Sequence, residues 1–186
     1  MRRVAPAEDL TARVAADIRA RTPIDDREAM SIERALAELS RLPSPFDEHA
    51  DPVHVTGSAL IVGRRGIVLL RHRRLGIWVQ PGGHVDPGET PWAAARREGC
   101  EETGLALEFP PDGPRLAHVD VHPGGRGHTH LDLRYVLDGD DADPAPPPDE
   151  SQQVHWFGWE AALARAEPAM APLLRHLAAS HPSTRR

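Results

Sequence analysis

Two N-terminal segments carry apolar residues at the three- and four-residue spacing of an amphipathic helix. We therefore predict helices over residues 8–21 and 28–42, which the prolines at positions 23 and 43 would end. The two helices would form a helical hairpin extension over residues 1–50. This hairpin either covers the core or pairs two subunits, and the second alternative would give a homodimer. The repeated apolar positions are Leu10, Val14 and Ile18 in the first segment and Ile32, Leu36 and Leu39 in the second.

From residue 51 onward the pattern changes to short runs of β-branched and aliphatic residues, which predict strands. These runs lie at residues 53–62, 67–70, 115–121, 130–137 and 154–157, with a turn at Arg64, Arg65 and Gly66 between the first two. A polar, proline-rich stretch at residues 138–150 predicts a loop. Helical spacing over residues 159–179 predicts a last helix, which Pro168 and Pro172 are expected to break or kink. We expect residues 51–186 to form the catalytic domain.

Composition and charge exclude several classes of protein. The 22 basic residues are all arginine, so a Walker-type phosphate loop and Schiff-base chemistry, which both need lysine, are excluded. The formal net charge of −6 argues against broad nucleic-acid binding. Cys100 is the only cysteine, which excludes an internal disulfide and a multi-cysteine metal site. Because the chain has neither a signal-peptide pattern nor a run of membrane-spanning length, we expect a cytoplasmic protein without membrane contact.

A glycine-rich loop leads into a helix that we predict over residues 91–103. Thr90 is a favourable N-cap, Pro91 suits the first helical position, and Gly104 suits a left-handed exit.

Three glutamates of this helix, Glu98, Glu101 and Glu102, stand at positions i, i+3 and i+4, so their carboxylates project from one face. Their mutual repulsion is expected to raise their pKa values and to weaken the helix unless a cation binds between them. Oxygen donors of this kind favour Mg²⁺ or Mn²⁺. The spacing alone leaves a solvated acidic face as the alternative.

In its wider context the segment resembles the Nudix box, in which these residue types recur at fixed spacing. The matching residues are Gly83, Glu89, Arg97, Glu98, Glu101, Glu102, Gly104 and Leu105. The resemblance implies the α+β Nudix fold, an αβα sandwich around a mixed β-sheet, and the activity of a pyrophosphohydrolase, a hydrolase acting on acid anhydrides. One position departs from the box, because Gly99 stands where the family has an aliphatic residue. Its missing side chain predicts either a void or a closer backbone approach.

The resemblance also implies site residues. Glu98, Glu101 and Glu102 would bind Mg²⁺, with Mn²⁺ as the alternative, together with the Gly83 carbonyl. Glu89 would pair with Arg97 and fix the loop against the helix. The three metal-binding glutamates, Arg97 and Glu89 form the predicted catalytic set.

The general base is left open between Glu98, Glu102 and Glu150. Members of the family often place an acidic residue about six positions before the tryptophan that Trp156 represents here, which makes Glu150 a candidate metal ligand as well. Its alternative is a solvated residue of an acidic loop.

Four further residues are candidates for substrate binding. His130 and Asp132 share one strand face with His128 and Arg134, while Leu131, Leu133 and Tyr135 share the other. The polar face is either exposed to solvent or lines a cleft, where it would bind phosphate or a second metal. Arg71 would contact phosphate or base, although an exposed basic turn fits equally well. Trp78 would stack on a base or pack in the core.

We therefore predict a metal-dependent hydrolase that cleaves the diphosphate bond of a nucleoside diphosphate linked to another moiety. The substrate would be a small-molecule nucleotide of the nucleoside triphosphate, ADP-ribose or nucleotide-sugar class, and the acidic balance disfavours RNA decapping. The alternative is a non-catalytic, nucleotide-sensing Nudix domain, against which the complete set of box carboxylates argues. An isomerase on this fold would need a cysteine and glutamate pattern that the chain lacks.

Overall fold

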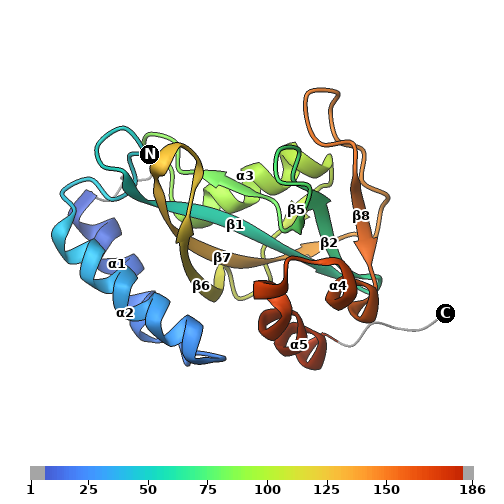
Figure 1. Ribbon diagram of the computed structural model, residues 1–186, viewed down its shortest axis with the longest axis horizontal. Helices are drawn as coiled ribbons and strands as arrows, with labels where there is room; N and C mark the ends of the chain where they lie inside the picture. Colours follow the sequence, from blue (N-terminus) through green and yellow to red (C-terminus); the bar gives the residue numbers. More distant parts are fainter. Residues whose placement is uncertain (1–6, 182–186) are drawn as a thin grey trace.

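The computed structural model describes residues 7–181, and its strands form one mixed eight-stranded sheet (Figure 1). The strands are β1 (Val53–Gly63), β2 (Gly66–Arg71), β3 (Trp78–Val79), β4 (Gly82–His84), β5 (Leu107–Glu108), β6 (Arg115–Pro123), β7 (Thr129–Gly139) and β8 (Val154–Phe157). The hydrogen-bonded order is β3-β2-β1-β7-β5, with β4 also paired to β1, β6 to β7 and β8 to β2. The central pair β1 and β7 is parallel, whereas the other pairs of these strands are antiparallel.

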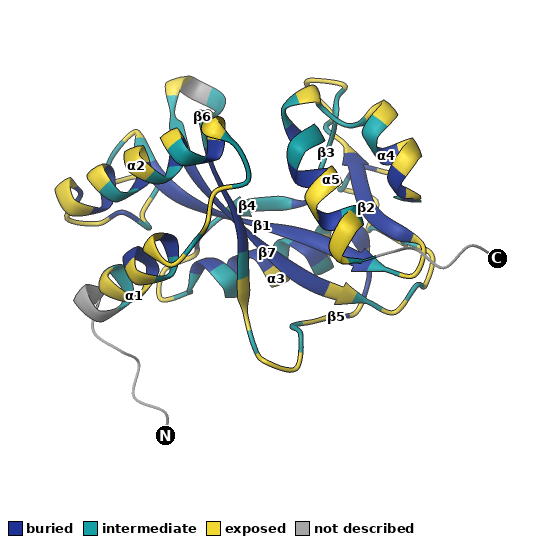
Figure 2. Ribbon diagram, turned by 90° about the horizontal axis from the view of Figure 1, so that it is seen from below, coloured by how far each residue is buried: buried dark blue, intermediate teal, exposed yellow. Residues whose placement is uncertain are grey.

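Helices cover both faces of this sheet. Helix α3 (Pro91–Thr103) packs on one face, and α4 (Trp159–Arg165) and α5 (Ala171–Ser180) pack on the other. Because successive side chains of a strand point to opposite faces, β1 serves two cores at once. Leu60 and Val62 join the α4–α5 core, whereas Ala59 and Ile61 lie beneath α3. The strands are buried through the middle of the molecule, and the outer sides of the helices are exposed (Figure 2). The predicted αβα arrangement is confirmed.

The N-terminal hairpin consists of α1 (Ala7–Arg19) and α2 (Asp26–Arg41), and it covers the edge of the sheet. Val14 and Leu39 from these helices share one hydrophobic core with Leu131 of β7. The backbone N–H groups of the edge strand β6 donate to side chains of α2, from Val119 to Glu28 at 3.2 Å and from Val121 to Ser31 at 3.1 Å. An unpaired strand edge can form hydrogen bonds with strands of other chains, and these two bonds occupy backbone donors of the β6 edge. Covering the core is thus one role of the hairpin, while a homodimer stays a prediction.

Gly99 marks a close approach between α3 and the sheet rather than a void. A Cβ at this position would lie 2.8 Å from Leu107 Cδ1 and 3.0 Å from Ala59 Cβ. Gly57 of β1 allows a similar close approach near the start of α3, since a Cβ on Gly57 would overlap the Pro91 carbonyl oxygen. The missing aliphatic side chain therefore lets the helix that carries the glutamates lie closer to β1.

The end of the chain differs in one respect from the sequence prediction. A break at Pro168 is present, where a 3₁₀ turn (Pro168–Met170) separates α4 from α5. The expected break at Pro172 is wrong, because this proline lies in the first turn of α5, where its missing N–H needs no partner. Within the described part of the chain, no helix has the length and apolar character needed to span a bilayer.

Candidate active site

The box residues form a loop and helix that are locally determined by the sequence. The Thr90 hydroxyl accepts a hydrogen bond from the Ala93 N–H at 3.3 Å, which caps α3, and Gly104 ends it at φ +70°. Strand β4 lies beside the helix, and a Cβ on Gly83 would overlap the carboxylate of Glu98. Glycine at this position therefore allows the Glu98 carboxylate to lie directly against the backbone of β4.

Arg97 holds the loop against the helix through five partners, of which Asp86 is the most distant at 3.4 Å. Its guanidinium lies 3.1 Å from a Glu89 oxygen and donates to the His84 carbonyl at 2.9 Å. The same group contacts Glu98 at 2.8 Å and Glu101 at 3.2 Å. The Glu89–Arg97 pair that the resemblance implied is present, and these contacts raise the pKa of Arg97. Arg97 neutralises part of the acidic cluster and connects it to β4.

Glu102 and Glu98 are the carboxylates that burial perturbs. Burial is the main cause that raises the pKa of Glu102 to about 7, and the charges of Glu98, Glu150 and Glu101 add to it. The pKa of Glu98 is also raised, mainly by burial, although Arg97 opposes this. The sequence predicted that mutual repulsion raises these pKa values; repulsion contributes, and the structure gives desolvation as the larger cause. Glu102 accepts a hydrogen bond from the Gly82 N–H at 2.9 Å, and within the described residues no cationic side chain pairs with it.

The remaining glutamates differ in position. The Glu101 side chain is 54% exposed and pairs with Arg97. Glu150 belongs to the loop before β8, and its charge raises the pKa of both Glu98 and Glu102. The fold thus brings a residue about fifty positions away in the sequence into electrostatic range of the helix, while the role of Glu150 as a metal ligand or general base stays a prediction.

Asp132 and Arg134 on the polar face of β7 are buried, so the solvent-exposed alternative is wrong for these two residues. Asp132 accepts from Ser58 Oγ at 2.7 Å and from Arg134 Nε at 2.8 Å. Arg134 also contacts Asp120 of β6 at 2.8 Å. Buried charges require such partners. Asp132 therefore already has an internal structural role, whatever it does toward a substrate.

The other predicted substrate-binding residues lie apart from this network. Arg71 is exposed and donates to the Gly76 carbonyl and to Gln153. Trp78 is partly buried against Phe157, at 5.0 Å between ring centroids, so packing accounts for much of its surface. His130 is half-buried within a cluster of histidines.

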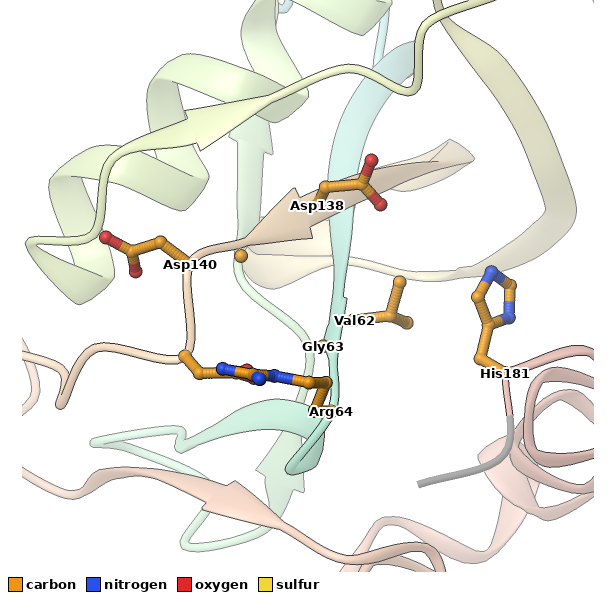
Figure 3. A pocket seen from close by; sticks show the side chains of 8 residues that line it. Val62, Gly63, Arg64, Asp138, Asp140 and His181 are labelled. Carbon is orange, nitrogen blue, oxygen red and sulfur yellow. The ribbon is translucent and has the colours of Figure 1, made fainter. Parts of the chain in front are cut away.

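A hollow of about 470 Å³ lies away from the box residues, at the C-terminal ends of β1 and β7 (Figure 3). Val62, Asp138 and His181 line it, and Arg64 at its rim is paired with Asp141 at 2.7 Å. It contains none of the box residues. We therefore place the candidate site at the carboxylates of α3 and not at this hollow.

The sequence did not single out two sets of residues that the fold brings next to Asp132 and His130. Ser58 and Gln80 contact Asp132, and His54 and His84 join His130. The signal was present but ambiguous: polar residues alternate along the first strand at positions 54, 56 and 58. Only the pairing of β1 with β7 shows that these residues face Asp132 and His130.

Comparison with known proteins assigns this fold and site to a class. The model of the NUDIX domain matches residues 52–177, and the chain belongs to the Nudix family. The predicted enzyme class, a hydrolase of pyrophosphate bonds, is confirmed with it.

Particular relatives support the same class. The chain is 28% identical to an RNA pyrophosphohydrolase of Rhodopseudomonas palustris (strain HaA2) over 132 residues, which cover 60% of this chain and 79% of that protein. Among solved structures, a NUDIX-family hydrolase from Clostridium perfringens aligns with a TM-score of 0.56 and 25% identity, covering 67% of this chain and 97% of the other. An Ap4A hydrolase from C. elegans aligns with a TM-score of 0.56 and 25% identity, covering 68% and 96%.

Proposed function

We propose that this chain is a Mg²⁺-dependent hydrolase that cleaves the diphosphate bond of a nucleoside diphosphate linked to another moiety. Glu98, Glu101, Glu102 and Glu150 would hold the cation together with the Gly83 carbonyl, and Mn²⁺ would substitute for Mg²⁺. The single observation that carries the proposal is the crowding of carboxylates around Glu102, which is mostly buried and has no cationic partner within the described residues.

The donor set fits a hard divalent cation. It consists of carboxylate and carbonyl oxygens, which Mg²⁺ and Mn²⁺ prefer. Desolvation and neighbouring charge disfavour the ionised form of Glu98 and Glu102. A cation among these oxygens would offset both effects, whereas Arg97 contacts only two of the four proposed metal-binding glutamates, Glu98 and Glu101.

The protein's own residues have distinct tasks in this proposal. Arg97 and Glu89 fix the loop so that the Gly83 carbonyl and the glutamates keep their relative positions. The Gly82 N–H holds one oxygen of Glu102, which leaves its other oxygen to bind the cation or to accept a proton. When bound, the cation would neutralise the diphosphate oxygens and lower the pKa of the attacking water.

The substrate class is the finer part of the proposal. Nucleoside triphosphates, ADP-ribose and nucleotide sugars remain the candidates from the sequence. The name of the C. elegans relative adds a dinucleoside polyphosphate, and that of the R. palustris relative adds RNA. The net charge of −6 disfavours RNA, because polyanion binding relies on a cationic surface.

A product assay on one nucleotide panel tests these alternatives. The panel holds a nucleoside triphosphate, ADP-ribose, a nucleotide sugar, a dinucleoside tetraphosphate and 5′-triphosphate RNA, each with Mg²⁺ and with chelator. We expect hydrolysis of at least one member with Mg²⁺ and none with chelator. A non-catalytic sensing domain would bind a nucleotide without forming product.

The variant Glu102→Gln tests the assigned site. It keeps the size of the side chain but removes the charge, so we expect the rate to fall by about 10² or more. Glu160→Gln on the exposed start of α4 is the matched control and should keep the full rate. If Glu102→Gln and the control are equally active, the role of Glu102 is wrong.

A further inference from the structure

Three histidines meet on the side of β4 that faces away from the box carboxylates. His54 of β1, His84 of β4 and His130 of β7 each offer a ring nitrogen, and these nitrogens all lie within 4.8 Å of one another. Their ring centroids are 5.1 to 5.5 Å apart. Since neighbouring side chains of a strand alternate, His84 points away from the face on which Gly83 meets Glu98.

The register of the sheet produces this cluster. His54 lies directly opposite His130 in the parallel ladder, and His84 lies opposite Thr56, two residues along the same face of β1. The three side chains therefore come from three different strands of one rigid sheet. Such a platform fixes ligand positions more firmly than a surface loop does.

His54 is held as a metal-binding histidine would be. Its side chain is fully buried, and its Nδ1 lies 3.3 Å from the Asp51 carbonyl oxygen. When Nδ1–H donates to that carbonyl, Nε2 carries the free lone pair. Nε2 is itself buried and has no hydrogen-bond partner in the described structure. A buried polar atom without a partner is rare and calls for a reason, and a bound cation would provide one.

The surroundings of His54 and His130 favour the neutral ring, which is the form that binds metals. Burial is the main cause that lowers the pKa of His54 and lowers that of His130 to about 4, and neighbouring histidines add to both. His84 is half-exposed, with its Nε2 3.4 Å from a Glu48 carboxylate oxygen. The cluster therefore has a side open to solvent and an acidic residue beside it.

We propose that His54, His84 and His130 bind one Zn²⁺ ion at a site separate from the carboxylates of α3. Imidazole nitrogens suit Zn²⁺ and its transition-metal neighbours, whereas Mg²⁺ prefers oxygen. Zinc commonly takes three protein ligands and leaves a fourth position for water. Zinc–nitrogen bonds of about 2.1 Å separate tetrahedral ligands by roughly 3.4 Å, so small side-chain rotations would close the present spacing. The ion would tie β1, β4 and β7 together beside Gly83.

Metal titration of the full chain, purified without a histidine tag and stripped with chelator, tests this site. Excess Mg²⁺ is present throughout, so that the carboxylates are occupied by the ion they prefer. Zn²⁺ binding is measured by competition with a chromophoric chelator, and Co²⁺ serves as a visible-absorption probe of nitrogen coordination. We expect one Zn²⁺ per chain and a Co²⁺ spectrum that Zn²⁺ abolishes.

Variants decide which residues are responsible. His84→Ala and His130→Ala should each weaken Zn²⁺ binding by at least about 100-fold. His176→Ala, an exposed histidine of α5, should bind as the unmodified protein does. His84 is half-exposed and tolerates truncation, so it remains informative if His130→Ala misfolds, which circular dichroism detects.

The outcomes separate this proposal from the proposed hydrolysis. Glu102→Gln should lose activity and keep Zn²⁺ binding, whereas His84→Ala should lose Zn²⁺ binding whatever its activity. The metal site is refuted if no saturable binding occurs, or if His84→Ala and His130→Ala fold and bind Zn²⁺ as tightly as the control. The histidines would then be a packed polar cluster only.

Discussion

Truncation of Glu28 to alanine should destabilise the whole protein, because this buried side chain is one of the links between the N-terminal hairpin and the sheet. The Glu28 carboxylate is fully buried. It accepts hydrogen bonds from Arg21 at 2.9 Å, from the Ile24 N–H at 2.8 Å and from the Val119 N–H at 3.2 Å. The last of these bonds reaches the edge strand β6, across about ninety residues of chain.

The expected cost follows from those partners. Removing one member of a buried ion pair costs about 3–5 kcal/mol, because the other charge loses its partner. The Arg21 side chain is 15% exposed and recovers part of its hydration, which places the pair near the lower end. Two backbone N–H groups also lose their acceptor, at about 1–3 kcal/mol each if no water replaces it. The lower ends of these values add to about 5 kcal/mol for Glu28→Ala, a large part of a typical domain stability of about 5–15 kcal/mol.

Urea unfolding measures this loss through the midpoint and slope of the transition. Glu33→Ala, on the exposed side of the same helix, is the control and should change stability by less than about 0.5 kcal/mol. Hydrogen exchange at the Val119 amide should also accelerate in Glu28→Ala. A loss below about 1 kcal/mol with unchanged Val119 exchange would refute the view that α2 covers this sheet edge.

Two further perturbations follow from the packing. Gly99→Leu restores the aliphatic residue of the box, but its Cβ would lie 2.8 Å from Leu107 Cδ1. Thermal unfolding should therefore show a loss of stability of about 1–3 kcal/mol. An increase in stability would contradict the close approach of α3 to the sheet. Asp132→Ala removes a partner of the buried Arg134 and should cost about 3–5 kcal/mol in urea unfolding. Unchanged stability together with weaker nucleotide binding would make Asp132 a binding residue and not a structural one.

The sequence by itself determined the local features of this protein. The cap at Thr90, the helix that follows and the left-handed exit at Gly104 depend on near neighbours, so their residue types suffice to predict them. The same holds for the face shared by Glu98 and Glu102, since helical geometry places residues four apart side by side. The runs of β1, β2, β6, β7 and β8 were also predicted, because alternation and β-branching are properties of the segment itself, whereas the short strands β3, β4 and β5 were not.

Only the tertiary structure decided what those segments meet. From the sequence, Gly99 of α3 could leave either a void or a close contact. Which of the two forms depends on Leu107 of β5 and Ala59 of β1, which lie against it. Asp132 of β7 is buried where it accepts a hydrogen bond from Ser58, because β7 pairs in parallel with β1. No local sequence pattern encodes that pairing. The histidine cluster arises in the same way, since the sheet register brings His54 opposite His130. Local physics fixes the elements, whereas the burial and the partners of a charged or polar side chain depend on contacts between residues far apart in the chain.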